Sequence, residues 1–358
     1  MRIPNSFAPL ALAALLLGLN GCSKPADNSN PSTPVTPGTE GAAPATKEKR
    51  IKLAYVTNGV DPFWNNAAAG VRKAEKDFDV DCEVMMPPKG IVDQQRMIEA
   101  SLARGIDGIA ISPIDAANQV GLINTAAERT HVITHDSDAP DSKRLCFVGM
   151  DNYKAGRAAG RLVKEALPNG GEVMIFVGRL EQLNAQQRRQ GVIDELLDRP
   201  VQSLDTIAYD PNGQPLKGAR YTIIDTRTDN FDYARAKSNA EDAMNTHPTL
   251  GCMVGLFAYN TPNCLSAVKE AGKIGQIKLV SFDEQDAVLQ GIMDGEVHGT
   301  VSQQPYEYGY QSVRILAALA RGDRSVLPPN GFHEVGIQEV RKASVEAFWA
   351  NLKKLQDG

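Results

Sequence analysis

From Ile51 onward, short apolar runs alternate with longer segments in which apolar residues recur at helical spacing. The first run, IKLAYVT (51–57), precedes a segment in which Ala67, Val71, Ala74 and Phe78 fall on one helical face. The alternation continues, with strand-like runs at 82–86, 107–112, 131–136, 145–151, 171–178, 220–226, 250–260, 277–283 and 298–304. Strands separated by helical patterns of about 10–15 residues are typical of βαβ units with mostly parallel sheets.

These strand-like runs are too many for one comfortable sheet. The pattern therefore predicts an α/β fold of two doubly wound, Rossmann-like lobes. In such sheets, ligands bind beyond the carboxyl ends of the strands. Polar residues that directly follow a strand are therefore the first candidates for a binding site.

The chain before Ile51 has a different character. Arg2 precedes an apolar stretch, FAPLALAALLLGLNGC (7–22), that is too short to span a bilayer comfortably, so residues 1–22 are predicted to be a secretory signal peptide. The ending LNGC resembles a bacterial lipobox, which implies lipidation of Cys22; the alternative is an ordinary signal peptide followed by an incidental cysteine. Residues 23–50 are rich in Pro, Ser, Thr, Gly and Ala, which predicts a disordered tether. We expect a periplasmic body attached to a membrane through the lipid alone.

Composition excludes some classes of function. A formal charge of −5 and a pI near 5.7 argue against a nucleic-acid surface, which needs clustered Lys and Arg. The five histidines show no pair at metal-ligand spacing on one element, so we expect neither a metal nor another cofactor. Of the remaining cysteines (Cys82, Cys146, Cys252 and Cys264), Cys252 and Cys264 are the nearest pair. A bridge between them and simple burial of small apolar side chains both remain open.

Hydrogen-bonding side chains follow most of the predicted strands. They are Thr57, Asp61, Asp136, Ser137, Asn260, Asp283 and Gln303. Phe63, Trp64 and Phe231 add aromatic faces, and Arg188 adds a forked donor. A sugar has polar edges and two partly apolar faces, so flat aromatic rings together with carboxylates, amides and a guanidinium suit it.

Plain structural roles remain open for several of these residues. Phe63 and Trp64 could pin the following helix against the sheet, and Phe231 could belong to the core. Asp61 could cap a helix, and Asp136 could be a turn residue. Asn184, one helical turn before Arg188, is a weaker candidate for the site.

Seven segments together resemble the periplasmic ribose-type sugar-binding proteins of ABC importers. They are AYVTNGVDPFW, ITHDSD, NAQQRRQG, NFDYARAKSNAEDAMNTHP, FAYNTPNCLSAVKEAG, LVSFDEQ and GTVSQQPYEYGYQSV, in that order from 51 to about 340. The resemblance implies the type I periplasmic binding protein fold, in which two lobes close around a ligand at a three-segment hinge. It places a first lobe at 51–150 plus about 304–332, and a second at 151–303 plus about 333–358. The connections between the lobes are expected near Asp151, near Gln303 and near Gly331 to Val335.

The resemblance also assigns roles, including the choice of Arg188 for the polar ring. It puts Phe63, Trp64 and Phe231 in an aromatic sandwich. Asp61 stands where ribose binders have Asn, and Ser137 where they have a second arginine, so the identity of the sugar stays open. Residues 209–222, which are rich in Pro and Gly, form an insertion that we expect to be a surface hairpin.

The leading hypothesis is a non-enzymatic receptor that delivers a monosaccharide or similar polyol to an ABC importer permease. A periplasmic sensor that presents the sugar to a chemoreceptor or kinase needs the same site. A glycosidase built on Asp61, Asp136 and Asp283 would need one carboxyl kept protonated, and the sequence offers no evident apolar pocket for that. A sugar-responsive repressor would carry a helix-turn-helix where this chain has a signal peptide and tether.

Overall fold

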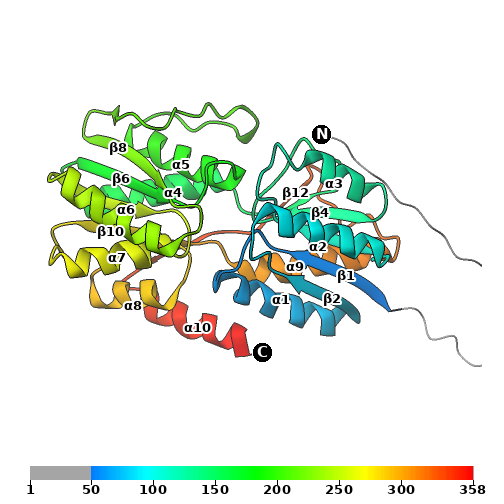
Figure 1. Ribbon diagram of the computed structural model, residues 1–358. Coiled ribbons are helices and arrows are strands. Elements are labelled where there is room, and N and C mark those ends of the chain that lie inside the picture. The colour runs from blue at the N-terminus through cyan, green and yellow to red at the C-terminus, as the bar shows by residue number, and fades with distance from the viewer. Residues whose placement is uncertain (1–49, 358) are drawn as a thin grey trace, which may run out of the picture. The chain divides into compact units, whose positions relative to one another are not determined.

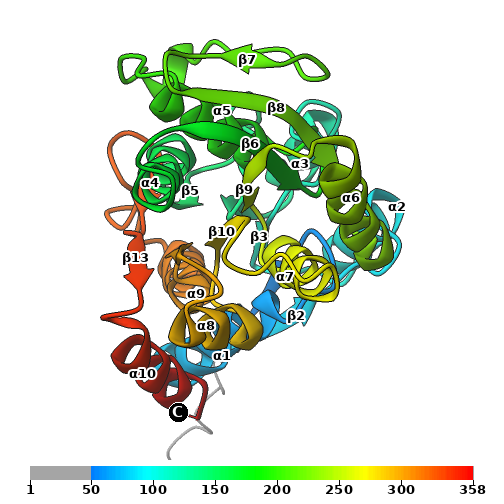
Figure 2. The same cartoon turned by 90° about the vertical axis from the view of Figure 1, so that its left-hand side faces the viewer.

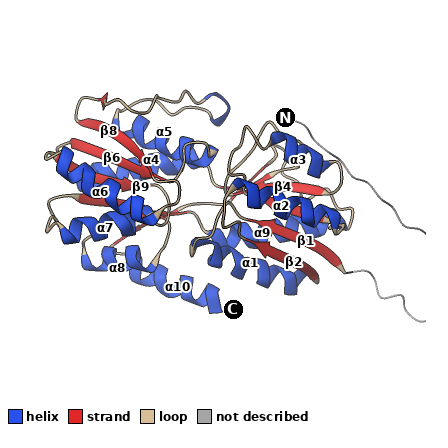
Figure 3. Ribbon diagram, in the orientation of Figure 1, coloured by secondary structure: helices blue, strands red, loops and turns tan. Residues whose placement is uncertain are grey.

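The computed structural model describes residues 50–357, so the predicted signal peptide, Cys22 and the tether as far as residue 49 lie outside the described residues. Residues 50–357 form two lobes, each with a mainly parallel sheet covered by helices on both faces (Figures 1 and 3). The predicted fold of two doubly wound lobes is confirmed.

The first lobe contains a six-stranded sheet whose neighbouring strands all pair in parallel, in the order β12-β5-β4-β3-β1-β2. These strands are β1 (Ile51–Val56), β2 (Val80–Met85), β3 (Gly108–Ile111), β4 (His131–His135), β5 (Phe147–Gly149) and β12 (Phe332–Glu334). Alternation along β1 gives each face its core. Leu53 and Tyr55 pack with helices α1 (Phe63–Phe78) and α9 (Pro305–Ala320), while Ala54 and Val56 pack with α2 (Ile91–Ala103) and α3 (Val120–Ala127).

The second lobe contains a seven-stranded sheet in the order β13-β11-β10-β9-β6-β8-β7. Its strands are β6 (Gly171–Val177), β7 (Leu216–Lys217), β8 (Tyr221–Thr228), β9 (Leu250–Gly255), β10 (Lys278–Phe282), β11 (Gly299–Ser302) and β13 (Gln338–Arg341). Only the edge strands β7 and β13 pair antiparallel among the described strands.

Helices cover both faces of this second sheet (Figure 2). Helices α4 (Asn152–Ala166) and α5 (Leu183–Leu196) lie on one side, and α6 (Tyr233–Thr246), α7 (Asn260–Glu270) and α8 (Asp286–Asp294) lie on the other. After β13 the chain ends in α10 (Val345–Asp357), which packs against α8 and also contacts α1 of the first lobe.

The chain crosses between the lobes three times. The first crossing joins β5 to α4, the second joins β11 to α9, and the third joins β12 to β13. At the first crossing, the Asp151 carboxylate accepts a hydrogen bond from Lys154 N at 2.9 Å and so caps α4. The third crossing lies after Glu334, within the stretch from Gly331 to Val335 to which the resemblance assigns this connection, because His333 and Glu334 pair with β5.

The insertion at 209–222 includes the short strand β7, which pairs with the start of β8 as a hairpin, as predicted. It is tied to α5: Arg189 donates to the carbonyl oxygens of Asp210 and Pro211 at 2.7 and 2.9 Å. Arg199 forms an ion pair with Asp210. The insertion therefore braces the helix that carries Arg188.

Two further features bear on the predictions. Among residues 50–357, the four cysteines are buried free thiols, so the bridge between Cys252 and Cys264 does not form in this structure.

In the same part of the chain, none of the helices combines the length and the apolar character needed to cross a bilayer.

Candidate functional site

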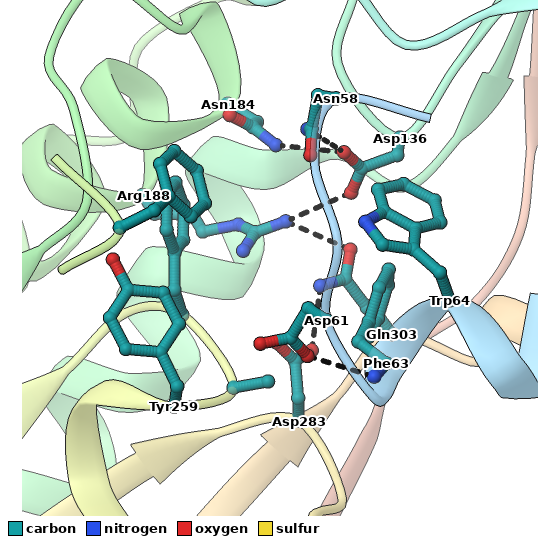
Figure 4. Close-up of a pocket in the computed structure, with 13 residues that line it drawn as sticks. Asn58, Asp61, Phe63, Trp64, Asp136, Asn184, Arg188, Tyr259, Asp283 and Gln303 are labelled. Carbon is teal, nitrogen blue, oxygen red and sulfur yellow. Dashed lines mark hydrogen bonds and ion pairs between the residues drawn. The ribbon is translucent and has the colours of Figure 1, made fainter. Parts of the chain in front are cut away.

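A cavity with about 350 Å³ of space lies where the carboxyl ends of the two sheets face each other (Figure 4). The lining comes from both lobes: Asn58, Asp61, Phe63, Trp64, Asp136, Asn184, Arg188, Phe231, Phe257, Ala258, Tyr259, Asp283 and Gln303.

Eight of the eleven residues predicted for the site line this cavity, namely Asp61, Phe63, Trp64, Asp136, Arg188, Phe231, Asp283 and Gln303. Thr57, Ser137 and Asn260 are fully buried and do not line it. Thr57 Oγ1 donates to Gly59 O at 2.7 Å, so the next residue, Asn58, faces the cavity instead.

Asn260 has a supporting role. Strand β9 ends at Gly255, earlier than the apolar run suggested, so the turn that follows contributes Phe257, Ala258 and Tyr259 to the lining. The Asn260 side chain accepts from Phe257 N at 3.0 Å and donates to Asp229 at 2.8 Å. It therefore fixes the turn that carries these residues.

Asp136 is the polar centre of the first lobe's wall. Its Oδ2 accepts from Asn58 at 3.1 Å, from Ser112 at 3.0 Å and, across the cleft, from Asn184 at 3.3 Å. Burial raises the pKa of this carboxyl, whereas the Arg188 guanidinium and the three hydrogen bonds lower it. Its φ of 58° lies in the left-handed region, which Asp tolerates better than most residues.

Arg188, on α5, is 1% exposed and faces Asp136 across the cleft at 3.7 Å (Figure 4). It donates to Asn152 Oδ1 at 2.9 Å, to Leu256 O at 3.0 Å and to Gln303 Oε1 at 2.8 Å. Helix α4 can approach this part of α5 because Gly156 lies against the Arg188 backbone, where a Cβ would collide with the carbonyl group. The guanidinium is therefore held rigidly, with only part of its donor capacity left for a ligand.

Asp283 follows β10 with φ 68° and is 2% exposed. Gln303, at the second crossing, donates to Asp283 Oδ1 at 2.6 Å. Burial raises the pKa of Asp283 well above its ordinary value; nearby Arg188 lowers it and the neighbouring Glu284 raises it. A ligand that donates a hydrogen bond to Asp283 would therefore satisfy a carboxyl that the protein itself stabilises poorly as an anion.

Asp61 joins the lobes at the rim of the cleft. Its Oδ2 accepts from Tyr233 Oη at 2.6 Å, and its Oδ1 accepts from Phe63 N at 2.8 Å and from Gln285 at 3.4 Å. Burial raises its pKa, and the bond from Tyr233 lowers it. The N-cap of α1 is Pro62, so Asp61 is not the helix cap; its bond to Phe63 N orders the turn before the helix, and the bond to Tyr233 adds a link to the second lobe.

The aromatic walls face each other from opposite lobes. In the first lobe, the Phe63 and Trp64 rings meet edge to face with centroids 4.8 Å apart, and Trp64 meets His135 in the same manner at 5.7 Å. Burial lowers the pKa of His135 to about 3, so at physiological pH its imidazole is neutral and serves only to pack against the neighbouring rings.

In the second lobe, Phe231 stacks on Phe257 at 5.6 Å, and the Arg179 guanidinium lies 4.9 Å from the Phe231 ring centre. The backbone of Phe231 has a φ of 64°, which is a genuine outlier for a bulky residue. Asp229 holds this conformation by accepting from Phe231 N at 2.9 Å, and it also accepts from Tyr259 Oη. Burial raises the pKa of Asp229 to about 6.

The cavity offers many acceptors and no reactive group with a base to activate it. No cluster of three or more His, Cys, Asp or Glu side chains that could hold a metal ion occurs among residues 50–357. The arrangement suits a flat, hydroxyl-rich molecule that donates to the carboxylates and stacks on the rings.

Known proteins give a consistent picture. The periplasmic binding protein domain family matches residues 53–324. The D-ribose/D-allose-binding protein of Pseudomonas aeruginosa is 26% identical over 254 residues, which cover 69% of this chain and 73% of that protein. The xylose/arabinose-binding protein XylF of Sulfolobus acidocaldarius is 24% identical over 301 residues, or 79% of this chain and 68% of its own.

Solved structures share the fold. A solute-binding protein of an ABC transporter from Burkholderia graminis, in complex with D-arabinose, has a TM-score of 0.73 at 24% identity and covers 83% of this chain and 96% of its own. The XylFII–LytSN complex contains a chain with a TM-score of 0.72 at 21% identity, covering 82% and 99%. The relatives are sugar-binding transport proteins and not enzymes. The chain therefore belongs to the periplasmic binding protein family and is of its ribose/galactose sugar-binding type.

Proposed function

We propose that this protein holds a monosaccharide or similar polyol between its lobes, with the ring between the aromatic walls and the hydroxyls on the polar groups. One observation carries the proposal. A single cavity receives aromatic faces and planar hydrogen-bonding groups from both lobes, in the place where ligands bind doubly wound sheets.

The polar groups proposed to hold the sugar are Asp136, Arg188, Asp283 and Gln303. Asn184, the weaker candidate from the sequence, joins them, and Asn58 is an addition that the sequence did not indicate. The carboxylates accept hydrogen bonds from adjacent hydroxyls of the sugar. The amides and the guanidinium hold the neighbouring side chains of the cavity wall in place, and they also donate to the ring oxygens of the sugar. A ligand favours closure only through contacts that it makes with the second lobe once the lobes meet. Phe231, Arg188 and Asp283, all in the second lobe, would supply contacts of this kind.

The family is periplasmic, which places the binding event in that compartment. We propose that the closed, loaded protein delivers its sugar to an ABC importer permease, and that a lipid on Cys22 anchors it to a membrane. A sensor is the second candidate, because XylFII, in a complex with LytSN, shares this fold.

A thermal-shift screen of the full chain tests the binding proposal. Pentoses, hexoses, inositols and deoxy sugars are each added to wild type and to Asp283→Ala. A ligand at a hundredfold its dissociation constant adds about 2.7 kcal/mol to the free energy of unfolding, which moves Tm by several degrees. We expect a shift with a narrow set of sugars that is lost in the variant. No shift with any sugar, in folded protein freed of bound ligand, would contradict the proposal.

Two measurements separate the finer proposals. Stimulation of the ATPase activity of a co-expressed importer by the loaded protein supports delivery, whereas co-purification with a sensor kinase domain supports the second candidate. Mass spectrometry of the mature N-terminus tests the lipid on Cys22, since an unmodified N-terminus at another residue contradicts it.

A further inference from the structure

A second cavity adjoins the first along the rim of the cleft. It has about 760 Å³ of space and shares Phe63, Ala258 and Asp283 with the first cavity. These shared residues form the boundary between the two spaces. Asp283 therefore lines both cavities, and the second cavity lies beside a molecule held against this carboxyl in the first.

The wall of this second cavity is rich in amides. Asn65 and Asn66 come from the start of α1, Gln285 precedes α8, and Gln356 comes from α10. An amide both donates and accepts, which is what a hydroxyl group requires of a partner. Among the described residues, no lysine or arginine lines this cavity, whereas Glu284 and Asp286 do. The lining therefore favours a neutral extension that carries hydroxyls and disfavours a phosphate or carboxylate.

The C-terminal helix builds part of this wall and fixes it in place. Trp349 Nε1 donates to Asp286 at 3.0 Å, and Gln356 Nε2 donates to Asn66 Oδ1 at 2.6 Å. Asn66 in turn donates to Glu284 Oε1 at 3.2 Å. The wall is thus a hydrogen-bonded unit from both lobes, and α10 lies after residue 324, where the match to the family ends.

We propose that this second cavity is a subsite for a neutral, hydroxyl-bearing extension of the ligand, such as a second sugar ring joined to the ring in the first cavity. The proposal rests on the proposed function of the first cavity. It assigns Asn65 and Gln356 to recognition of the extension, because they line the second cavity only.

Calorimetric titration of the full chain tests this with matched sets of sugars. Galactose is compared with lactose and lactobionate, glucose with cellobiose and cellobionate, and xylose with xylobiose. Each disaccharide adds a neutral ring, and each aldonate replaces a ring by a carboxylate-bearing chain. We expect at least one disaccharide to bind tenfold or more tightly than its monosaccharide, and the aldonate to lose that gain.

Variants locate the effect. Asn65→Ala is expected to reduce the gain from the second ring and to leave the affinity for the monosaccharide unchanged. Gln356→Ala also loses the bond to Asn66 of the first lobe, so it is expected to weaken both affinities, and that for the disaccharide more. Asn245→Ala, exposed at the far end of α6, is the matched control and should change neither affinity.

The outcomes separate this proposal from the function on which it rests. If a monosaccharide binds and no disaccharide binds more tightly, the subsite is refuted and the proposed function stands. A tighter aldonate refutes the neutral extension, and an equal loss of both affinities in Gln356→Ala refutes its role in recognition. If no sugar of either kind binds, the proposed function and the subsite both fail.

Discussion

Glu284 provides the sharpest test of the electrostatics around the cleft. It is 5% exposed, and its two carboxylate oxygens accept from Asn66 Nδ2 at 3.2 Å and from Ser302 Oγ at 2.9 Å. No cation among residues 50–357 stabilises its charge, and burial raises its pKa from the ordinary 4.5 to about 7. The substitution Glu284→Gln keeps the shape and removes the charge. Its amide can still accept from Asn66 and can donate to Ser302.

The sign of the pH effect follows from the raised pKa. Between about pH 4.5 and 7 the folded protein keeps a proton on Glu284 that the unfolded chain has released, so stability falls as pH rises through this window. Well above pH 7, Glu284 is ionised in the folded protein too, and the stability gained from its bound proton at lower pH is gone. At about 1.4 kcal/mol per pKa unit, the loss is roughly 3 kcal/mol. Glutamine does not titrate, so Glu284→Gln should exceed wild type in stability by up to this amount at pH 8 and match it near pH 4.5.

Thermal unfolding of wild type and Glu284→Gln at several pH values from 4.5 to 8 measures the difference. At pH 8 we expect the variant to melt roughly 5 °C higher, given about 2–4 °C per kcal/mol for proteins somewhat smaller than this one. Glu99→Gln, an exposed site on α2, is the control and should leave the pH profile unchanged. A variant that is less stable than wild type at pH 8 would refute the reasoning, because it would mean that the ionised carboxylate stabilises the fold.

Three further predictions test the site and its surroundings. Removal of the buried acceptor in Asp283→Ala should weaken sugar binding by about a hundredfold, measured by calorimetric titration, because a hydrogen bond to a charged group contributes about 1.5–3 kcal/mol; an unchanged affinity would place the ligand elsewhere. Tyr233→Phe loses the hydroxyl that donates to Asp61, so stopped-flow fluorescence should show ligand dissociation a few-fold faster; an identical rate would mean that this bond does not hold the lobes together. The four described cysteines are buried and burial raises the pKa of each thiol, so Ellman's reagent at pH 8 should react with none of them until the protein unfolds; rapid reaction of any one in the native protein would contradict the packing.

The architecture could be predicted because burial imposes a period on the sequence. In β1, Leu53 and Tyr55 face one core while Ala54 and Val56 face the other, so a parallel strand covered on both sides reads as a continuous apolar run. Helices α1 and α9 show the helical period equally clearly. Helix α10 shows this period too, with Val345, Phe348, Trp349 and Leu352 at the second lobe's core. The edge strands β7 and β12 are too short to show a period of their own.

The site could be predicted as far as the ends of strands could be located. Asp136 and Asp283 directly follow β4 and β10, and both were found. Asn58 was missed in favour of Thr57, because the choice between neighbours depends on the direction of the turn. Phe257 and Tyr259 were missed in favour of Asn260, because β9 ends earlier than its apolar run.

Residues that hold the lining side chains in place without lining the cavity could not be predicted from the sequence, for a different reason. Asp229 contacts Phe231, Tyr259 and Asn260 through hydrogen bonds, and nothing in its own neighbourhood of sequence distinguishes it from a turn residue. Glu284 likewise follows Asp283 as an ordinary acidic residue. Its raised pKa arises only because the fold buries it against α1.

The contacts across the cleft also bear on how strongly a ligand controls closure of the lobes. Tyr233 with Asp61, Asn66 with Glu284 and Asn184 with Asp136 join protein to protein, so they stabilise the closed arrangement whatever molecule occupies the cavity. Each such bond contributes about 1 kcal/mol to the closed state. The ligand therefore has to supply less free energy to close the lobes, and its affinity rises. The same bonds reduce the difference in closure between the loaded and the unloaded protein, since a ligand shifts the equilibrium only by its own differential contacts. Loss of these bonds should therefore weaken binding and, at the same time, make the response of a partner that reads closure depend more strictly on the ligand.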